Sequence, residues 1–296
     1  MRILLIGASG QVGSECDALL HSLTADYLAL SRQQLDFADT QALRRQLVSF
    51  NPEVVVNACA YTAVDQAQTQ QALAEQVNAQ SVAILAQTCH EIGAILIHLS
   101  TDYVFDGQAQ VPYTEDAQAK PLGVYGATKY AGEQAIVASM KQFVILRTSW
   151  VFGLQGHNFV KTMLRLGRER DQLAVVNDQW GRPTYAADIA RVIVSIIERY
   201  QRKNGQLEWG VYHCCNGGET SWYAFAQSIM EQGLRYGLLS RLPEIAPIPS
   251  VDYPTPAPRP AYSVLDTHKL DTAIGAMPSW KDALERFFTE YVACDR

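Results

Sequence analysis

The sequence lacks the features that mark membrane, nucleic-acid-binding and exported proteins. It has no run of about eighteen or more apolar residues, so we expect no membrane-spanning helix. No block of basic residues stands out, and 24 basic against 30 acidic residues give a net charge of −6, so we expect no nucleic-acid partner. Gly7 interrupts the first apolar stretch too early for a signal peptide.

The cysteines also lack a pattern, because none of the six stands in CxxC spacing. Most lie in apolar segments, which predicts buried thiols rather than a metal site or a disulfide framework. A cytoplasmic, reducing location fits this usage best. The cysteines are Cys16, Cys59, Cys89, Cys214, Cys215 and Cys294.

Short apolar runs alternate with helical patterns through the first half of the chain. Strands that alternate with helices predict βαβ units. We therefore expect an α/β fold with a Rossmann-type, doubly wound parallel sheet. The expected strands are Ile3–Ile6, Tyr27–Leu30, Val54–Asn57, Ala94–Leu99 and Phe143–Leu146, and the expected helices lie near 11–22, 40–49, 70–92 and 125–139.

After Trp150 the alternation becomes less regular. The proline-rich stretch from Pro243 to Pro260 predicts an ordered loop rather than a strand or helix, because proline removes backbone donors. The other elements expected here are helices near 157–168, 186–199 and 279–293 and strands over Leu173–Val176 and Val211–Cys214.

A glycine-rich turn follows the first expected strand and opens the first helix. Its spacing is GxxGxxG, formed by Gly7, Gly10 and Gly13 with Gln11 and Val12 between them. Such glycines allow a tight turn and a close approach of the backbone to a pyrophosphate, and the helix N-terminus favours the anion. The turn predicts dinucleotide binding, and the plainer alternative is an ordinary strand-to-helix connection.

The second expected strand ends at Ser31 and Arg32, where an acidic residue would bind a ribose hydroxyl and favour NAD. A guanidinium pairs well with a phosphate, so we expect NADPH, with NADH as the alternative. The plainer reading of Arg32 is a solvated loop residue. Further cofactor contacts are expected after the second and third strands, at Asp36, Phe37, Ala58, Ala60, Tyr61 and Thr62.

Tyr125 and Lys129 stand four residues apart, so on a helix their side chains share one face. Thr101 follows the strand before them, at the sheet edge where ligands of open α/β sheets bind. Hydride addition to a carbonyl leaves an alkoxide that needs a proton. A neighbouring ammonium would lower the phenol pKa, while Thr101 would hold the carbonyl oxygen. We expect these three residues to be catalytic and Tyr125 and Lys129 to contact the cofactor; the alternative is a surface Tyr and Lys.

These residues resemble the extended short-chain dehydrogenase/reductase superfamily and, within it, the family of dTDP-4-dehydrorhamnose reductases. The resemblance implies an NAD(P)-binding Rossmann domain over 1–153, with returning segments near 182–215, and a smaller, mainly substrate-binding domain over 154–296. It covers nearly the whole chain through Gly7–Gly13, Asn57–Asp65, Ser100–Gly107, Tyr125–Lys129, Arg147–Val151, Asn158–Met163, Asp178–Thr184 and Arg259-Pro260.

The resemblance implies reduction of the 4-keto group of dTDP-4-dehydro-β-L-rhamnose to dTDP-L-rhamnose, a step of dTDP-rhamnose and cell-surface polysaccharide synthesis. The nucleotide sugar would contact Val104, Phe105, Trp150, Asn158, Lys161, Gln179 and Arg259. Lys161 and Arg259 could balance its diphosphate. From the residues alone, core packing explains Phe105 and Trp150, and a solvated helix face explains Lys161.

Three other functions stay open beside this one. Related sugar dehydratases carry Asp-Glu after the Thr, whereas this chain has Asp102-Tyr103 and so lacks the base for elimination. Related epimerases share the Tyr and Lys but usually have a Ser-rich strand end. A regulatory subunit similar to that of methionine adenosyltransferase would not need the intact Thr101, Tyr125 and Lys129.

Some members of the family bind Mg²⁺ between subunits through acidic side chains. Glu15, Asp188 and Glu290 stand at the matching places, and carboxylates suit this hard cation. We therefore expect a Mg²⁺ site and a homodimer as features that the resemblance implies. Three solvated acids on helices are the alternative.

Overall fold

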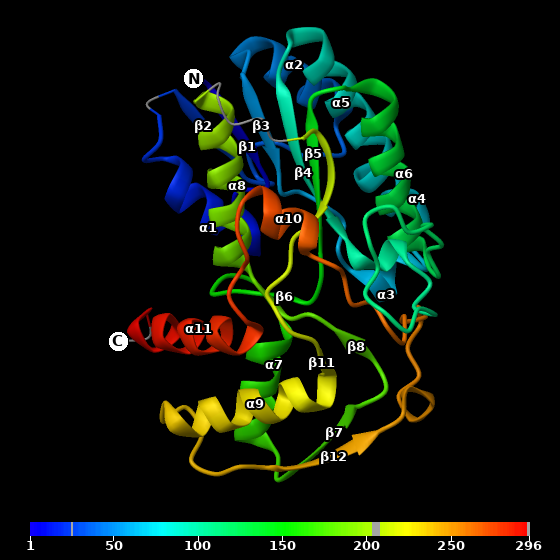
Figure 1. The fold of residues 1–296 in the computed structure, drawn as a ribbon, viewed down its shortest axis with the longest axis vertical. Helices are drawn as coiled ribbons and strands as arrows, with labels where there is room; N and C mark the ends of the chain where they lie inside the picture. The colour runs from blue at the N-terminus through cyan, green and yellow to red at the C-terminus, as the bar shows by residue number, and fades with distance from the viewer. Residues whose placement is uncertain (25, 203–207, 295–296) are drawn as a thin grey trace.

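The computed structural model describes residues 1–24, 26–202 and 208–294, so the parts of the predicted domains at 25, 203–207 and 295–296 lie outside the described residues. Its centre is a parallel six-stranded sheet in the order β10-β5-β4-β3-β1-β2 (Figure 1). The predicted α/β fold with a parallel central sheet is confirmed. The strands are β1 (Ile3–Ile6), β2 (Tyr27–Leu30), β3 (Val54–Asn57), β4 (Ile95–Thr101), β5 (Phe143–Thr148) and β10 (Gly210–His213).

Both faces of this sheet are covered by helices, because successive side chains of a buried strand point to opposite faces. Ile3 and Leu5 pack into a core with α1 and α8, whereas Leu4 and Ile6 pack into a second core with α2, α5 and α6. Leu270 of α10 joins the first core. The helices are α1 (Gln11–Leu20), α2 (Thr40–Phe50), α5 (Ser81–Ile92), α6 (Val124–Ser139), α8 (Ala186–Gln201) and α10 (His268–Ala273).

The rest of the chain forms a smaller part beyond the carboxyl ends of the strands (Figure 1). Its core is aromatic and includes Phe152, Phe225, Phe287 and Phe288, all essentially inaccessible. The chain crosses between the two parts several times, since α8, β10 and α10 return to the large sheet. The elements here are β6 (Val151–Phe152), α7 (Phe159–Glu169), β7 (Gln172–Val176), β8 (Trp180–Gly181), β9 (Thr184–Tyr185), β11 (Thr220–Ser221), α9 (Trp222–Arg235), β12 (Glu244–Ile248) and α11 (Trp280–Cys294).

The proline-rich stretch corrects one expectation. We predicted no strand between Pro243 and Pro260, but β12 spans Glu244–Ile248 and pairs in parallel with β7, with Pro247 opposite Val175. The strand tolerates this proline because it lies in a two-stranded sheet and has a free edge where no backbone donor is needed. A short 3₁₀ turn, Ser250–Asp252, follows it.

The expected helix near 70–92 is interrupted. It consists of α4 (Gln71–Glu75), a π-helical turn over Gln76–Gln80 and α5, and the four-residue α3 (Val64–Ala67) precedes it. π-turns often occur at functional sites, and this one carries the buried side chain of Asn78.

The cysteines bear out the expectation of buried thiols. All six are free, four are buried and Cys294 is exposed. Among the described residues we find no helix whose length and apolar character would let it cross a bilayer.

Candidate active site

The glycine turn lies between β1 and α1, at the carboxyl edge of the sheet. Gly7 has φ of +88°, which favours glycine, and its carbonyl accepts the Gly10 N–H at 3.0 Å. Gly10 begins α1 without a side-chain cap. The first amide groups of the helix are therefore available to an anion.

Side chains would not fit in this turn. A Cβ on Gly13 would lie 1.9 Å from the carbonyl oxygen of Gly7, and a Cβ on Gly7 would lie 2.8 Å from the backbone of Ala58. Because Ala58 follows β3, the turn lies at the point where the chain order reverses across β1, the usual ligand crevice of such sheets. The cradle fits a dinucleotide pyrophosphate.

Polar residues follow the end of β2, where contacts to the cofactor are predicted. Arg32 is exposed, and Ser31 donates both its N–H and its hydroxyl to the Gln34 side chain, each at 2.8 Å. Asp36 is exposed as well, but the ring of Phe37 is packed in the core against α2. The Phe37 ring is therefore part of the core rather than of an open cofactor surface.

Asn78 of the π-turn fixes the loop that carries Ala58, Ala60, Tyr61 and Thr62. Its amide oxygen accepts the Tyr61 N–H at 2.8 Å, and its amide nitrogen donates to the Tyr61 carbonyl and to Thr128 of α6. The same side chain thus ties the predicted cofactor loop to the helix of Tyr125 and Lys129. Sequence reasoning missed it, because only the interruption of the helix points to it.

The structure brings Thr101, Tyr125 and Lys129 together. The Thr101 hydroxyl is close enough to the Tyr125 phenol to lower its pKa, and Lys129, one turn further along α6, donates to the carbonyl oxygen of Leu99 at 2.6 Å. Gly126 makes this possible, because a Cβ there would lie 2.1 Å from the Tyr103 carbonyl oxygen of the 3₁₀ turn Asp102–Val104.

A buried ion pair holds the same helix against the sheet. Glu133 of α6 accepts three hydrogen bonds at 3.0, 3.2 and 2.7 Å from Arg147 of β5, and its Oε1 also accepts the Ser100 hydroxyl. Arg147 and Glu133 are at most 4% exposed. Removing either partner would leave an uncompensated buried charge, which makes this pair a strong constraint on the position of α6.

The electrostatics of the pair differ from the sequence expectation. Burial raises the pKa of Tyr125 to about 12, and the neighbouring Thr101 hydroxyl offsets this only in part. Burial also lowers the pKa of Lys129 to about 8. Lys129 does not lower the pKa of the Tyr125 phenol as expected, because its amine is turned to Leu99 and His98.

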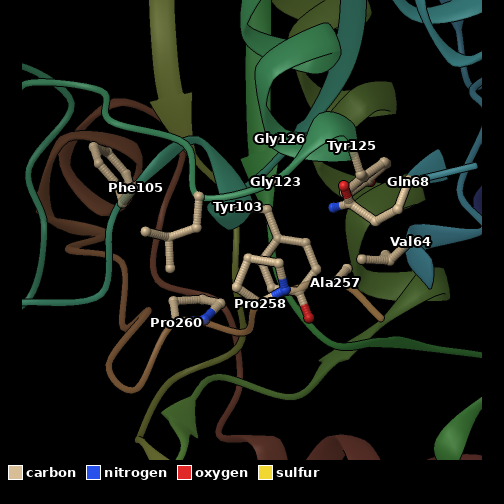
Figure 2. Close-up of a pocket in the computed structure, with 11 residues that line it drawn as sticks. Val64, Gln68, Tyr103, Phe105, Gly123, Tyr125, Gly126, Ala257, Pro258 and Pro260 are labelled. Atoms are coloured by element: carbon tan, nitrogen blue, oxygen red, sulfur yellow. The ribbon is translucent and has the colours of Figure 1, made fainter. Parts of the chain in front are cut away.

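A narrow pocket opens beside Tyr125 (Figure 2). Tyr103 meets Tyr125 edge to face at 5.7 Å between ring centroids, and Gln68 has a buried amide nitrogen without a partner among the described residues. Sequence reasoning named neither Tyr103 nor Gln68 as a contact. The remaining lining comes from Val64, Phe105, Leu122, Gly123, Gly126, Ala257, Pro258 and Pro260.

The apolar residues expected at a sugar pocket occupy different surroundings. Val104 and Phe105 are fully buried, and the Phe105 ring stacks on Tyr113 at 4.3 Å, apart from Tyr125 in Figure 2. Core packing therefore accounts for Val104, whereas Phe105 also lines the pocket beside Tyr125. Trp150 is half-buried, has a rare positive φ of 47° and stacks face to face on Trp222. Such backbone strain persists only where the surrounding structure holds the residue in place.

The polar residues expected at the substrate divide into two groups. Asn158 caps α7 and donates to Gln11 of the glycine turn at 2.9 Å, and the Lys161 ammonium is held by the carbonyls of Leu154 and Gly156.

Gln179 and Arg259 form the second group. Gln179 donates to the Ser250 hydroxyl at 2.8 Å. Arg259 pairs with Asp65 at 2.9 Å through one nitrogen, while its other terminal nitrogen is buried without a partner among the described residues. The Arg259 guanidinium lies 5.9 Å from the centroid of the Tyr103 ring, and Tyr103 lines the pocket.

The predicted Mg²⁺ site is not supported. Both oxygens of Asp188 are taken by Arg286 at 2.9 and 2.7 Å, with Arg191 and Asn216 adding further bonds. Glu290 accepts the Tyr185 hydroxyl. Within the described ranges no group of three or more His, Cys, Asp or Glu side chains is arranged to hold a metal ion. The guanidinium groups of Arg286 and Arg191 already neutralise the Asp188 carboxylate, so its oxygens are not free to bind Mg²⁺.

Asp102, beside Thr101, yields a prediction about stability. It is 3% exposed, its Oδ1 accepts the Thr101 hydroxyl at 3.0 Å, and burial raises its pKa to about 6. Because the folded pKa lies above the unfolded value near 4, the protein loses stability as pH rises through about 6. Asp102→Asn should therefore raise the free energy of unfolding at pH 7.5 by about 2 kcal/mol.

Denaturant titrations of both proteins between pH 4 and pH 8 measure this effect. The wild type should lose stability relative to Asp102→Asn across that interval. Parallel curves for the two proteins would show that the Asp102 carboxyl has the same pKa in the folded and unfolded states.

Comparisons with known proteins show which family this chain resembles over its length. A family model described as the RmlD substrate binding domain matches residues 1–293. The dTDP-4-dehydrorhamnose reductase of Aggregatibacter actinomycetemcomitans is 41% identical over 286 residues, 96% of this chain and 97% of that protein. The crystal structure of a dTDP-4-dehydrorhamnose reductase from Clostridium acetobutylicum has a TM-score of 0.90 at 36% identity and covers 98% of this chain and 99% of its own. The Bacillus anthracis reductase in complex with NADP gives 0.89 at 36% identity over the same shares.

Proposed function

The chain belongs to the RmlD substrate binding domain family, and from this membership we propose that it is a dTDP-4-dehydrorhamnose reductase. It would use NADPH to reduce the 4-keto group of dTDP-4-dehydro-β-L-rhamnose to dTDP-L-rhamnose. The observation that carries the proposal is the placement of Thr101, Tyr125 and Lys129 at the sheet edge that also bears the glycine turn.

The chain supplies the proton and the orientation in this reaction. Bound NADPH would supply the hydride, held at its phosphates by Gly7–Gly13. Tyr125 would donate its phenolic proton to the alkoxide oxygen, while Thr101 holds that oxygen in place. Lys129, one helical turn away, would stabilise the phenolate that Tyr125 leaves behind. Burial of Tyr125 at a pKa of about 12 keeps it protonated until the alkoxide forms.

We propose that the nucleotide sugar binds between the carboxyl ends of the large sheet and the smaller part of the chain. The terminal nitrogen of Arg259 that has no partner among the described residues suits the substrate diphosphate, and the family resemblance assigns Trp150 and Gln179 to the same substrate. The division into a cofactor domain over 1–153 and a substrate domain over 154–296 stays a prediction, as do the homodimer and the cytoplasmic location.

Arg32 gives a test of the cofactor preference. If its guanidinium binds the 2′-phosphate, Arg32→Ala should raise the KM for NADPH roughly tenfold or more, since a hydrogen bond to a charged group contributes about 1.5–3 kcal/mol. The KM for NADH should stay nearly constant, because NADH has no such phosphate. Steady-state kinetics with both cofactors measure the two values.

Arg45→Ala is the matched control for this variant, since Arg45 is an exposed arginine of α2 away from the turn. It should leave both KM values in place. An equal change in both cofactors for Arg32→Ala would mean that Arg32 does not recognise the 2′-phosphate.

A further inference from the structure

A chain of buried polar side chains lies behind Lys129. His98 stands within the apolar strand β4 and is fully buried, as is Asn57 at the end of β3. Asn57 Nδ2 lies 2.9 Å from His98 Nδ1, and His98 Nε2 lies 3.3 Å from Lys129 Nζ. A buried imidazole in this position needs a defined partner on each nitrogen.

The backbone of Cys59 fixes the orientation of the Asn57 amide. Its oxygen accepts the backbone N–H of Cys59 at 3.1 Å, and a backbone N–H can only donate. The amide nitrogen therefore faces His98, and because an NH₂ group only donates, Nδ1 of His98 must be the acceptor.

This arrangement determines where the imidazole carries its proton. Burial and the neighbouring Lys129 hold the pKa of His98 well below its usual range, so the ring is neutral. A neutral ring that accepts at Nδ1 carries its proton on Nε2. That N–H points to Lys129 Nζ, and an ammonium group has no lone pair with which to accept it.

The other groups around Lys129 favour the ammonium. Burial lowers the pKa of Lys129, whereas Glu133 on its own helix and Cys59 after β3 both raise it, and the carbonyl oxygen of Leu99 accepts one of its hydrogens. Tyr125 lies one turn away on the same helix. His98 is thus the one of these neighbours that presents a hydrogen rather than a negative or acceptor group.

We propose that Asn57 and His98 are positioning residues that set the proton content of Lys129: Asn57 fixes the Nε2–H tautomer of His98, and this N–H destabilises the ammonium. In the proposed reductase, Lys129 then loses its proton at a pH closer to neutral than an ordinary lysine does. The catalytic consequence rests on the proposed function, whereas the tautomer does not.

Nitrogen NMR of protein labelled with ¹⁵N-histidine tests the first step without turnover. The His98 resonances, identified by their loss in His98→Leu, should show Nδ1 without a proton and Nε2 with one. Asn57→Asp replaces the donor by an acceptor and should invert this tautomer. A proton on Nδ1 in the wild type, or an unchanged tautomer in Asn57→Asp, would overturn the proposal.

The pH dependence of kcat/KM tests the second step. His98→Leu removes the N–H, so the alkaline limb should move to higher pH by about one unit. A histidine that accepted a hydrogen bond from the ammonium would give the opposite shift, and either that shift or no shift would overturn the proposal. His213→Leu removes another fully buried histidine, which lies against Asp266 rather than Lys129, and should leave the limb in place.

These outcomes are separable from a failure of the proposed function. A protein that does not oxidise NADPH with the sugar nucleotide would still show the tautomer of His98. An active protein with the other tautomer would retain its proposed function and lose only this inference.

Discussion

Tyr125→Phe is expected to fold and to bind NADPH but to lose about 10²- to 10⁴-fold in kcat, the usual contribution of a general acid. The substitution removes one hydroxyl and leaves the ring, so the edge-to-face contact with Tyr103 is retained. The proton for the alkoxide is lost, together with the interaction between the phenol and the Thr101 hydroxyl. Steady-state kinetics, with a binding titration of NADPH, measure the effect.

Tyr130→Phe is the matched control, because Tyr130 lies on the same helix directly after Lys129 and packs with the cluster around Phe105. It should keep kcat within a factor of a few. Wild-type turnover in Tyr125→Phe would show that another group donates the proton.

Gly13→Ala is expected to abolish NADPH binding. The added Cβ would lie 1.9 Å from the Gly7 carbonyl oxygen, and backbone atoms cannot move away as a flexible side chain would. The turn must open, and the amide groups at the start of α1 then no longer converge on one phosphate. We expect the dissociation constant for NADPH to rise by at least about a hundredfold, measured by calorimetric or fluorescence titration.

The control separates loss of the cradle from general destabilisation. A Cβ on Gly217 would meet its nearest atom at 3.7 Å, an ordinary contact, and Gly217 lies far from the turn in the chain. Gly217→Ala should bind NADPH as the wild type does. Tight NADPH binding by a folded Gly13→Ala would mean that the pyrophosphate lies elsewhere.

The strands of the large sheet could be predicted closely from the sequence. Their runs are apolar on both faces, because helices cover both sides, and this pattern is hard to mistake. β4 extends two residues beyond the predicted Leu99, since Ser100 and Thr101 still pair with Arg147 and Thr148 of β5. Pairing partners are a property of the fold and cannot be read from polar residues at a strand end.

The smaller part of the chain was harder to predict. α9 carried a signal, because Phe225, Ala226, Ile229 and Met230 are spaced for one helix face and Ser221 caps the start, but we did not predict it. β12 was predicted as loop because of its proline, and only its edge position explains why a strand forms there.

The site was predictable in its chemical types and not in its contacts. The spacing of Tyr125 and Lys129 shows a shared helix face, and the structure brings Thr101 to the same place. The direction of a side chain depends on distant residues, however. The Lys161 ammonium is turned to the carbonyl groups of its own loop, which no local pattern indicates.

The most direct test of the account is the stoichiometry of NADPH oxidation by the purified protein. With dTDP-4-dehydro-β-L-rhamnose as substrate, one NADPH should be oxidised for each dTDP-L-rhamnose formed. An epimerase or dehydratase would transform a sugar nucleotide without net oxidation of the cofactor. Product without NADPH oxidation, or tight NADPH binding without turnover of any such sugar nucleotide, would contradict the assignment of Tyr125 as the acid of a reductase.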